Sequence, residues 1–243
     1  MPELASYRAK RANPSRLRPE YLHLRDLNQA LKDALTGKTG RWLDYGSHTS
    51  PYEEYLAGRL DTADIEGTQT PSEPTYRFRP GNPCPAGDAT FDGILSTQVL
   101  EHVADPAFYL ADARRMLKPG GELVLSTHGI WRDHPSPRDF RRWTTDGLAE
   151  DLRRAGFTAV TARPVTCGAR ALTTLGLIEL KATLNRHDLT RGPAVKKAFR
   201  AACLIANLGA DIGLGSQAVA PEQGRNALYV AIVATARSQA PIG

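Results

Sequence analysis

Short apolar runs alternate with stretches of helical periodicity along this chain of 243 residues. The clearest helix covers residues 21–35, where four leucines recur at helical spacing and two glycines follow. Further helices are expected over 52–58, 106–117, from Thr144 or Thr145 to Gly156, over 169–184 and over 194–209. Strands are expected over 41–46, 63–66, 75–78, 93–96, 122–127, 158–164 and 226–235.

Strands that alternate with helices predict an α/β fold with a mostly parallel sheet and helices on both faces. A chain of this length can bury one sizeable core, so residues 1–243 are expected to form a single domain. Residues 1–40, polar and basic at first, are interpreted as an N-terminal helical extension. Residues 168–222 are interpreted as a helical lid or insertion before the last strand.

Composition narrows the class of protein. No apolar run approaches the length of a membrane span, and the N-terminus lacks the apolar core of a signal peptide. Cys84, Cys167 and Cys203 lack metal-ligand spacing, which favours free thiols and a cytoplasmic location. A net charge of +5 is too mild to mark a nucleic-acid-binding protein by itself.

Two segments carry a resemblance to a known family. Residues 91–103 read FDGILSTQVLEHV, and residues 117–127 read LKPGGELVLST. Together they resemble the second half of a class I S-adenosylmethionine (SAM) methyltransferase, of the type 11 group. The resemblance covers residues 41–165 and the final strand. It implies a seven-stranded Rossmann-like sheet with an antiparallel last strand, SAM as the cofactor, and methyl transfer as the reaction.

The first strand-to-helix turn is where this family brings the backbone close to the methionine part of SAM. The turn here reads Asp44-Tyr45-Gly46-Ser47-His48-Thr49-Ser50. Asp44 and Gly46 match the family pattern, whereas His48 stands where a second glycine is expected and Ser50 replaces a third. The resemblance therefore assigns Asp44, Gly46, Ser47 and His48 to cofactor binding, and it requires a backbone at His48 that tolerates a side chain.

An acid at the end of the second strand accepts hydrogen bonds from the ribose in Rossmann-like sites. The resemblance gives this role to Asp64, with Glu66 as the alternative if the strand ends later. The family often has another acid after the third strand for the adenine amino group. Residues 77–82 contain none, so adenine recognition is expected to use backbone groups or other side chains.

Ser96, Thr97 and Gln98 end the fourth strand, where the reactive end of SAM meets the acceptor in this family. Some relatives that make ubiquinone or methylate small-RNA ends carry Glu-x-x-Glu-His here and bind a divalent metal. Gln98 replaces the first carboxylate in this chain, which removes a ligand that a hard cation prefers. We therefore predict no metal site, and a capping or structural role for Glu101 and His102.

The long segment after the fifth strand overhangs the site in this fold. Residues 128–143 hold two of the three tryptophans and two of the six histidines. Aromatic surfaces and arginines suit a sugar or an anionic small molecule. His128 is predicted as the base, with His134 as its substitute. Acceptor contacts are predicted for Trp131, Arg132, Arg142 and Trp143, although at least one tryptophan is expected to pack on the sheet edge instead.

The resulting hypothesis is a SAM-dependent methyltransferase that acts on a small polar acceptor, such as a hydroxyl of a sugar or a secondary metabolite. Two alternatives stay open: a SAM-fold protein that binds or assembles without catalysis, and, ranked lower, an RNA methyltransferase. The basic amphipathic segment 194–209 suits a lid, a dimer face or a membrane surface, of which the lid is favoured. A homodimer is compatible with the sequence.

Overall fold

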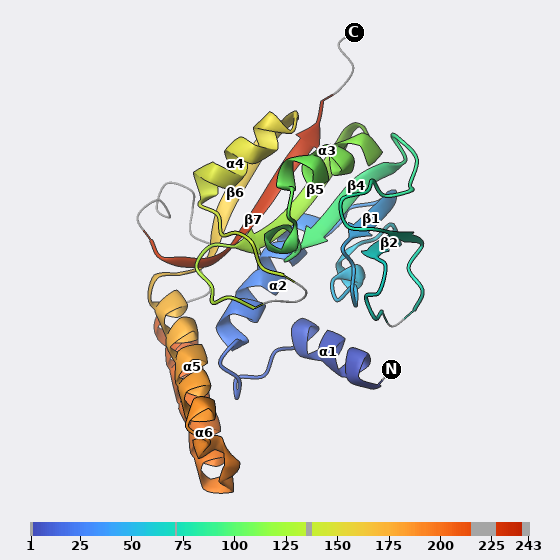
Figure 1. Cartoon of the computed structure of the whole chain (residues 1–243). Coiled ribbons are helices and arrows are strands. Elements are labelled where there is room, and N and C mark those ends of the chain that lie inside the picture. Colours follow the sequence, from blue (N-terminus) through green and yellow to red (C-terminus); the bar gives the residue numbers. More distant parts are fainter. Residues whose placement is uncertain (1, 71, 135–137, 215–226, 240–243) are drawn as a thin grey trace.

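Seven strands form one sheet in the computed structural model, which describes residues 2–70, 72–134, 138–214 and 227–239 (Figure 1). The order across the sheet is β3-β2-β1-β4-β5-β7-β6. The strands are β1 Arg41–Tyr45, β2 Arg59–Ile65, β3 Tyr76–Phe78, β4 Phe91–Thr97, β5 Leu117–His128, β6 Phe157–Cys167 and β7 Tyr229–Ser238.

The direction of the strands confirms the expected fold class. β1 pairs in parallel with β2 and β4, β2 with β3, and β4 with β5. The last strand, β7, lies antiparallel between β5 and β6. The chain leaves β1 for β2 on one side and returns to β4 on the other. The carboxyl ends of β1 and β4 therefore flank the point where the strand order reverses, which is where open α/β sheets bind ligands.

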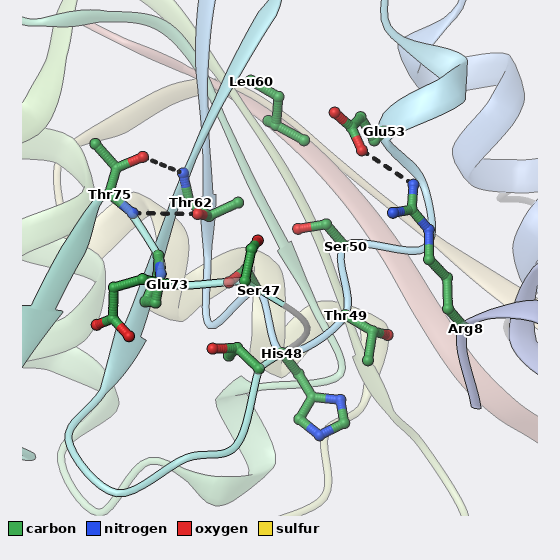
Figure 2. A pocket seen from close by; sticks show the side chains of 13 residues that line it. Arg8, Ser47, His48, Thr49, Ser50, Glu53, Leu60, Thr62, Glu73 and Thr75 are labelled. Carbon is green, nitrogen blue, oxygen red and sulfur yellow. Dashed lines mark hydrogen bonds and ion pairs between the residues drawn. The ribbon is translucent and has the colours of Figure 1, made fainter. Parts of the chain in front are cut away.

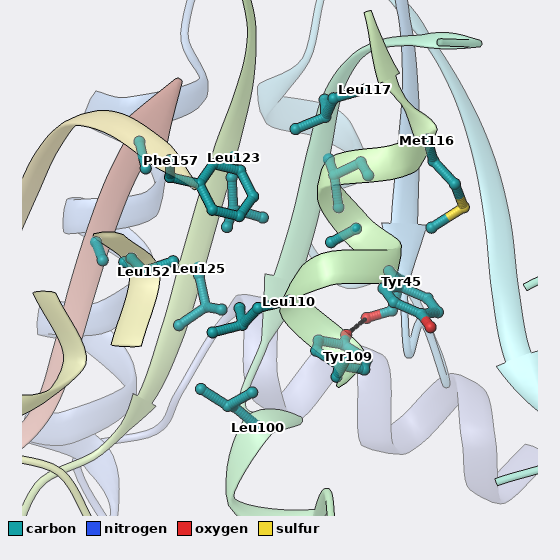
Figure 3. Close-up of a cluster of buried hydrophobic side chains, with 14 of the residues drawn as sticks. Tyr45, Leu100, Tyr109, Leu110, Met116, Leu117, Leu123, Leu125, Leu152 and Phe157 are labelled. Carbon is teal, nitrogen blue, oxygen red and sulfur yellow. Dashed lines mark hydrogen bonds between the residues drawn. The ribbon is translucent and has the colours of Figure 1, made fainter. Parts of the chain in front are cut away.

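Helices cover both faces of this sheet. The α-helices of the described residues are α1 Pro2–Ala12, α2 Tyr21–Leu35, α3 Pro106–Met116, α4 Thr145–Arg154, α5 Gly168–Arg186 and α6 Pro193–Leu214, of which α2, α3 and α4 pack on the sheet. Apolar residues of α3 and α4 form the larger core with one face of the sheet (Figure 3). On the opposite face, Leu27, Leu31 and Leu35 of α2 pack against β1, β5 and β7, while Leu24 lies outside this buried stripe.

Capping residues set the ends of the two core helices. The Asp105 side chain accepts a hydrogen bond from the Phe108 backbone N–H, and Pro106 opens α3. The hydroxyl of Thr144 accepts from the Gly147 backbone N–H at 3.0 Å, so Thr144 rather than Thr145 caps α4. Gly156 then takes φ +86°, as a residue that ends a helix often does.

The expected helix over 52–58 is wrong. A single 3-10 turn, η1 Glu53–Tyr55, occupies this place, and the chain is extended again at Leu56. The segment is too short to offset the cost of nucleating an α-helix, and it begins directly after Pro51. Several elements are longer than expected, among them β5, which begins at Leu117 paired with Phe91, and α6, which continues to Leu214.

Helices α5 and α6 form a hairpin that extends away from the sheet (Figure 1). A 3-10 turn, η3 Leu189–Arg191, lies between them. A buried ion pair fixes the hairpin to α2, since Nε and Nη2 of Arg170 donate to the two carboxylate oxygens of Asp26. This hairpin accounts for the predicted helices of the 168–222 insertion. The part of that insertion from residue 215 onward lies outside the described residues.

Within the described residues, none of the helices has the length and apolar character needed to cross a bilayer. Cys84, Cys167 and Cys203 are buried and form no disulfide.

Candidate active site

The turn after β1 has the conformation of a glycine-rich loop, although it contains one glycine. Gly46 has φ +85°, and a Cβ placed there would lie 2.6 Å from a methyl group of Val99. His48 and Ser50 both have φ +43°, so two residues with side chains occupy the left-handed region. His48 thus carries its side chain in a backbone conformation that favours glycine, and not in one that accepts a side chain freely. The turn presents backbone to the carboxyl edge of the sheet despite the two missing glycines.

Asp44 lies at the base of this turn and is almost completely buried. One carboxylate oxygen, Oδ2, accepts from the Ser50 hydroxyl at 2.8 Å, and the other has no hydrogen-bond partner among the described residues. Desolvation raises the pKa of Asp44 to about 7, and the nearby carboxylates of Asp64 and Glu53 add to the effect. A buried carboxyl with a free oxygen and a raised pKa suits a cationic or hydrogen-bond-donating ligand.

Asp64, near the end of β2, holds the turn in place. Its Oδ2 accepts from the backbone N–H of His48 at 2.7 Å, and its Oδ1 accepts from the backbone N–H of Ile65. A carboxylate offers about four acceptor sites, so both oxygens can accept a further bond. Glu66, the sequence alternative, is exposed and pairs with Arg79 at 3.0 Å. The geometry therefore favours Asp64 over Glu66 as the acid of the site.

A cavity of about 290 Å³ lies beside the same turn (Figure 2). Ser47 and His48 line it together with residues of β2 and of the segment before β3. Arg8 of α1 lies at its rim and forms an ion pair with Glu53 at 3.0 Å. Burial lowers the pKa of His48, which keeps its imidazole neutral near pH 7. Two of the predicted cofactor residues thus border a space that a ligand could enter.

The three predicted cofactor residues at the end of β4, Ser96, Thr97 and Gln98, differ in how accessible their side chains are. The Ser96 side chain is completely buried and bonded to the Tyr109 hydroxyl at 2.8 Å, so it can offer a ligand only its backbone. Thr97 and Gln98 are half-buried at the carboxyl edge. Gln98 turns the chain with φ +56°, and its amide oxygen has no hydrogen-bond partner among the described residues. Ser96 can therefore take part in cofactor binding only through its backbone.

His128 ends β5 in a cluster of rings. It stacks on Trp131 with 4.9 Å between ring centroids and 5° between planes, and the edge of His134 lies 5.2 Å away. From α2, the ring of His23 reaches within 4.9 Å of Trp131. Burial lowers the pKa of His128 well below its ordinary value, and the neighbouring imidazoles lower it further. The His128 ring is therefore neutral at pH 7.

Glu101 faces this ring from the turn after β4. Its Oε1 lies 3.4 Å from Nε2 of His128, and its Oε2 accepts from the Thr127 hydroxyl at 2.9 Å. Glu101 is fully buried, which raises the pKa of its carboxyl. Glu101 Oε1 and His128 Nδ1 both lack a hydrogen-bond partner among the described residues, so the contact between Oε1 and Nε2 is close without being a formed hydrogen bond. A carboxylate–histidine pair of this kind can remove a proton from a hydroxyl.

His134 and His102 approach Glu101 from the other side. One oxygen or nitrogen from each of these three residues lies within 4.8 Å of the others, a spacing that could hold a metal ion. Nδ1 of His102 lies 2.5 Å from the Arg138 carbonyl oxygen, and Nδ1 of His134 lies 3.0 Å from Asp139. Gln98 does not belong to the group. If the chain binds a divalent cation, these three side chains are its candidate ligands.

The prediction of Arg142 as an acceptor ligand is wrong. Its five N–H groups all donate within the loop, to both oxygens of Asp139 and to the backbone carbonyls of Trp131, Arg132 and Arg141. None remains for an anionic ligand. Arg142 instead folds the loop, and this pairing holds the pKa of Asp139 well below its usual range.

The remaining loop residues separate into two groups. The indole N–H of Trp143 donates to Asp151 at 2.9 Å, and its ring packs in the core with α4. Trp143 is therefore the tryptophan with a structural role. Trp131 is partly exposed over His128. Arg132 is nearly half exposed and lies 3.8 Å from Glu179 of α5. Trp131 and Arg132 thus remain available to an acceptor.

Sequence reasoning missed His23, Asp139 and the pairing of Glu101 with His128. His23 is buried on α2, and burial lowers its pKa to about 3. A histidine amid the apolar positions of that helix was a signal, though a weak one. The spacing of Asp139 and Arg142, i to i+3, was not informative outside a helix.

Comparison with known proteins is consistent with this geometry. A sequence model of a family described as a methyltransferase domain matches residues 15–162. A ubiquinone biosynthesis O-methyltransferase of Ruegeria pomeroyi is 34% identical over an alignment of 122 residues; the match covers 42% of this chain and 48% of the relative. A protein of the same name from Cereibacter sphaeroides is 38% identical over 118 residues, with the same shares. The chain thus spans less than half the length of these curated relatives.

Solved structures share the fold. Phosphoethanolamine N-methyltransferase 2 of Haemonchus contortus, in complex with S-adenosyl-L-methionine, has a TM-score of 0.51 at 14% identity and aligns with 88% of this chain and 52% of its own. The [4+2]-cyclase SpnF has a TM-score of 0.52 at 20% identity, with 90% and 83% covered. At these identities the likeness supports the fold alone.

Proposed function

This chain belongs to the SAM-dependent methyltransferases, and we propose that it transfers the methyl group to a hydroxyl of a small polar acceptor. One observation carries the proposal: the buried pair of His128 and Glu101 lies at the carboxyl end of β5, beside the end of β4. A neutral imidazole held by a carboxylate is suited to an acceptor that must lose a proton. The three buried free cysteines support a reducing compartment such as the cytoplasm.

The residues at the turn fit SAM. Three buried oxygens there lack a partner among the described residues: Asp44 Oδ1, Thr49 Oγ1 and Gln98 Oε1. Leaving such groups unpaired is costly, so a ligand rich in donors would stabilise them. The ammonium and ribose hydroxyls of SAM are donors of that kind. We assign Asp44 to the ammonium, Gly46 to the amino-acid backbone and Asp64 to the ribose.

When bound, SAM supplies a methyl group on a positively charged sulfur that can be displaced in line. The chain's part is to align the acceptor, exclude water and take its proton. Trp131 offers an aromatic face for a sugar ring, and Arg132 offers a partly exposed cation. Nδ1 of His128 accepts the hydroxyl proton as the carbon–oxygen bond forms. Glu101 then stabilises the imidazolium at Nε2.

A labelled-methyl experiment tests the acceptor class. The protein is incubated with methyl-labelled SAM and, separately, with the small-molecule, RNA and protein fractions of a bacterial extract. We expect the label in polar small molecules of the first fraction. Label in RNA would favour the RNA methyltransferase, and SAM binding without any transfer would favour the non-catalytic alternative. Either result would refute the proposal.

Asp44 predicts how SAM affinity depends on pH. Because its pKa is raised to about 7, the carboxyl is protonated in the free chain below that pH, and binding the ammonium must release the proton. Affinity should therefore rise about tenfold per pH unit from pH 5 to 7 and then level off. Asp44→Asn should bind more weakly at pH 7 and show a much flatter profile. Calorimetry across this range measures both, and a steep profile retained in Asp44→Asn would contradict the assignment.

The same carboxyl affects the ligand-free chain. Its folded-state pKa lies above the unfolded value of 3.8, so its favourable effect on stability is complete below pH 3.8 and is lost as the pH rises toward 7. Asp44→Asn should therefore be more stable, relative to the parent, at pH 7 than at pH 4. Urea unfolding at the two pH values measures the difference, and an unchanged difference would contradict the raised pKa.

Methyl transfer is predicted to need no divalent metal, because Gln98 lacks the carboxylate that a hard cation prefers. Activity should persist after dialysis against a chelator. Loss of activity with the chelator and its return with magnesium would contradict this prediction. In that case Glu101→Gln and His134→Gln should each weaken the magnesium response, whereas the exposed His187→Gln should not.

A further inference from the structure

The charge of this chain is concentrated at one place. Residues 181–200, at the far end of the α5–α6 hairpin, contain six basic residues and one acid, Asp188. Their net charge equals the +5 of the whole chain, so the remainder is close to neutral. Lys196, Lys197 and Arg200 are exposed and form no ion pair with any residue that the structure describes. This end of the hairpin is therefore a basic projection on a neutral body.

The same hairpin exposes apolar surface. Nine large apolar side chains are exposed in the described parts of the chain, and six of them belong to the hairpin: Leu172, Leu180, Leu189, Ile205, Leu208 and Ile212. The hairpin supplies about one fifth of the residues, so this share is far above an even distribution. Ile205 is 72% exposed and Ile212 84% exposed. Such a concentration marks an interaction surface.

On α6 this surface is a continuous stripe. Seven exposed residues at helical spacing carry no charge: Ala198, Ala201, Ala202, Ile205, Leu208, Gly209 and Ile212. The opposite face holds the buried Cys203, Asn207 and Ala210. The amide of Asn207 donates to the carbonyl oxygens of Arg16 and Arg18, which fixes that face toward the body. The stripe, named here the α6 stripe, thus faces away from the protein.

We infer that the α6 stripe and the basic end of the hairpin bind the surface of a membrane that contains anionic phospholipids. An apolar stripe with basic residues at its flanks is the pattern of a helix that lies at the headgroup boundary. Lys197 borders the α6 stripe near the tip of the hairpin, and Leu189 is exposed in the turn between the helices. Basic side chains meet the anionic headgroups while Ile205, Leu208 and Ile212 enter the boundary.

Charge disfavours the other occupants. A second copy packed tip to tip would bring two projections of net charge +5 together. If the tip of one hairpin packed against the base of another, its basic residues would meet Arg16, Arg18 and Arg25. The acid at the base, Asp211, is already paired with Arg16, Arg25 and Arg170 and offers no free negative charge. A nucleic acid would satisfy the charges, but it would leave the α6 stripe exposed. The lid that the sequence favoured would place these charges over the site, whereas the hairpin extends away from the sheet (Figure 1).

Vesicle flotation with the whole chain tests the inference. Vesicles of phosphatidylcholine alone are compared with vesicles that contain about a third phosphatidylserine. We expect binding to the second kind and little binding to the first. Each basic residue near an anionic surface strengthens binding roughly fivefold, so the double variant Lys196→Glu, Lys197→Glu should weaken it by more than tenfold. The matched double variant Arg153→Glu, Arg154→Glu on α4 should bind like the parent.

The apolar contribution is tested with Ile205→Asp, Ile212→Asp. Both side chains are exposed, so the fold should survive, and circular dichroism checks that it does. We expect vesicle binding to fall at least tenfold while the affinity for SAM stays unchanged. Equal binding of the parent to both kinds of vesicle, or none, would overturn the inference. A dimer in light scattering that this double variant converts to a monomer, without vesicle binding by the parent, would assign the stripe to a second copy instead.

Discussion

Replacing His128 by Gln should lower the turnover number by about 10²–10⁴-fold, the usual contribution of a general base, and leave the affinity for SAM nearly unchanged. Gln is neutral and of similar size, so it can keep the contact with Trp131, but it cannot take a proton. His128→Ala should show the same loss in turnover. Steady-state kinetics with SAM and the acceptor, together with calorimetry for SAM, measures the two effects separately.

His134→Gln serves as the comparison, because His134 is the substitute base and shares the ring cluster. Its effect on turnover should be much smaller, since its Nδ1 lies against Asp139. Glu101→Gln should fall between the two, because it removes the charge that stabilises the imidazolium. A large loss with His134→Gln and a small one with His128→Gln would reverse the assignment.

Replacing Asp64 by Ala should weaken SAM binding by about 1.5–3 kcal/mol, the range for a lost hydrogen bond to a charged group. In dissociation constants this is roughly 10-fold to 150-fold. Part of the loss comes from the turn, because Asp64 also accepts from the backbone N–H of His48. A SAM analogue that lacks a ribose hydroxyl separates the two contributions: the parent should lose affinity for it, and Asp64→Ala should lose little more.

Glu66→Ala is the matched control for Asp64→Ala. It removes an exposed carboxylate two positions away, whose partner in the chain is Arg79. Its affinity for SAM should equal that of the parent. A loss of SAM affinity in Glu66→Ala but not in Asp64→Ala would show that Glu66, two residues further along the chain, is the acid that binds the ribose.

The sheet could be predicted from the sequence because the strands of a parallel sheet are short apolar runs bounded by turn residues such as glycine and proline. Gly156 and the Thr144 cap have local causes, and the structure agrees with both. The segment 52–58 could not be predicted correctly, since its composition allows a helix and only its length and its tertiary surroundings decide. The α1 helix was likewise not visible in a polar, basic stretch.

The candidate site was partly predictable, and the reason differs between its two halves. The turn at Asp44 and Gly46 and the acid at Asp64 follow from chain order, because the carboxyl ends of neighbouring parallel strands meet. The loop after β5 has no such rule. Arg142 was predicted to bind the acceptor, yet its donors are used by Asp139 and three carbonyls of its own loop. Whether a charged side chain serves the fold or a ligand depends on where its neighbours lie in space.

We expect SAM to lie over the turn at Gly46 with its methyl group directed toward His128. A crystal structure with S-adenosylhomocysteine, the demethylated product, tests it most directly. We expect the amino-acid part against Gly46, the ribose within hydrogen-bond distance of Asp64, and the sulfur facing the space between Gln98 and His128. A ligand whose sulfur faces away from His128 would contradict it.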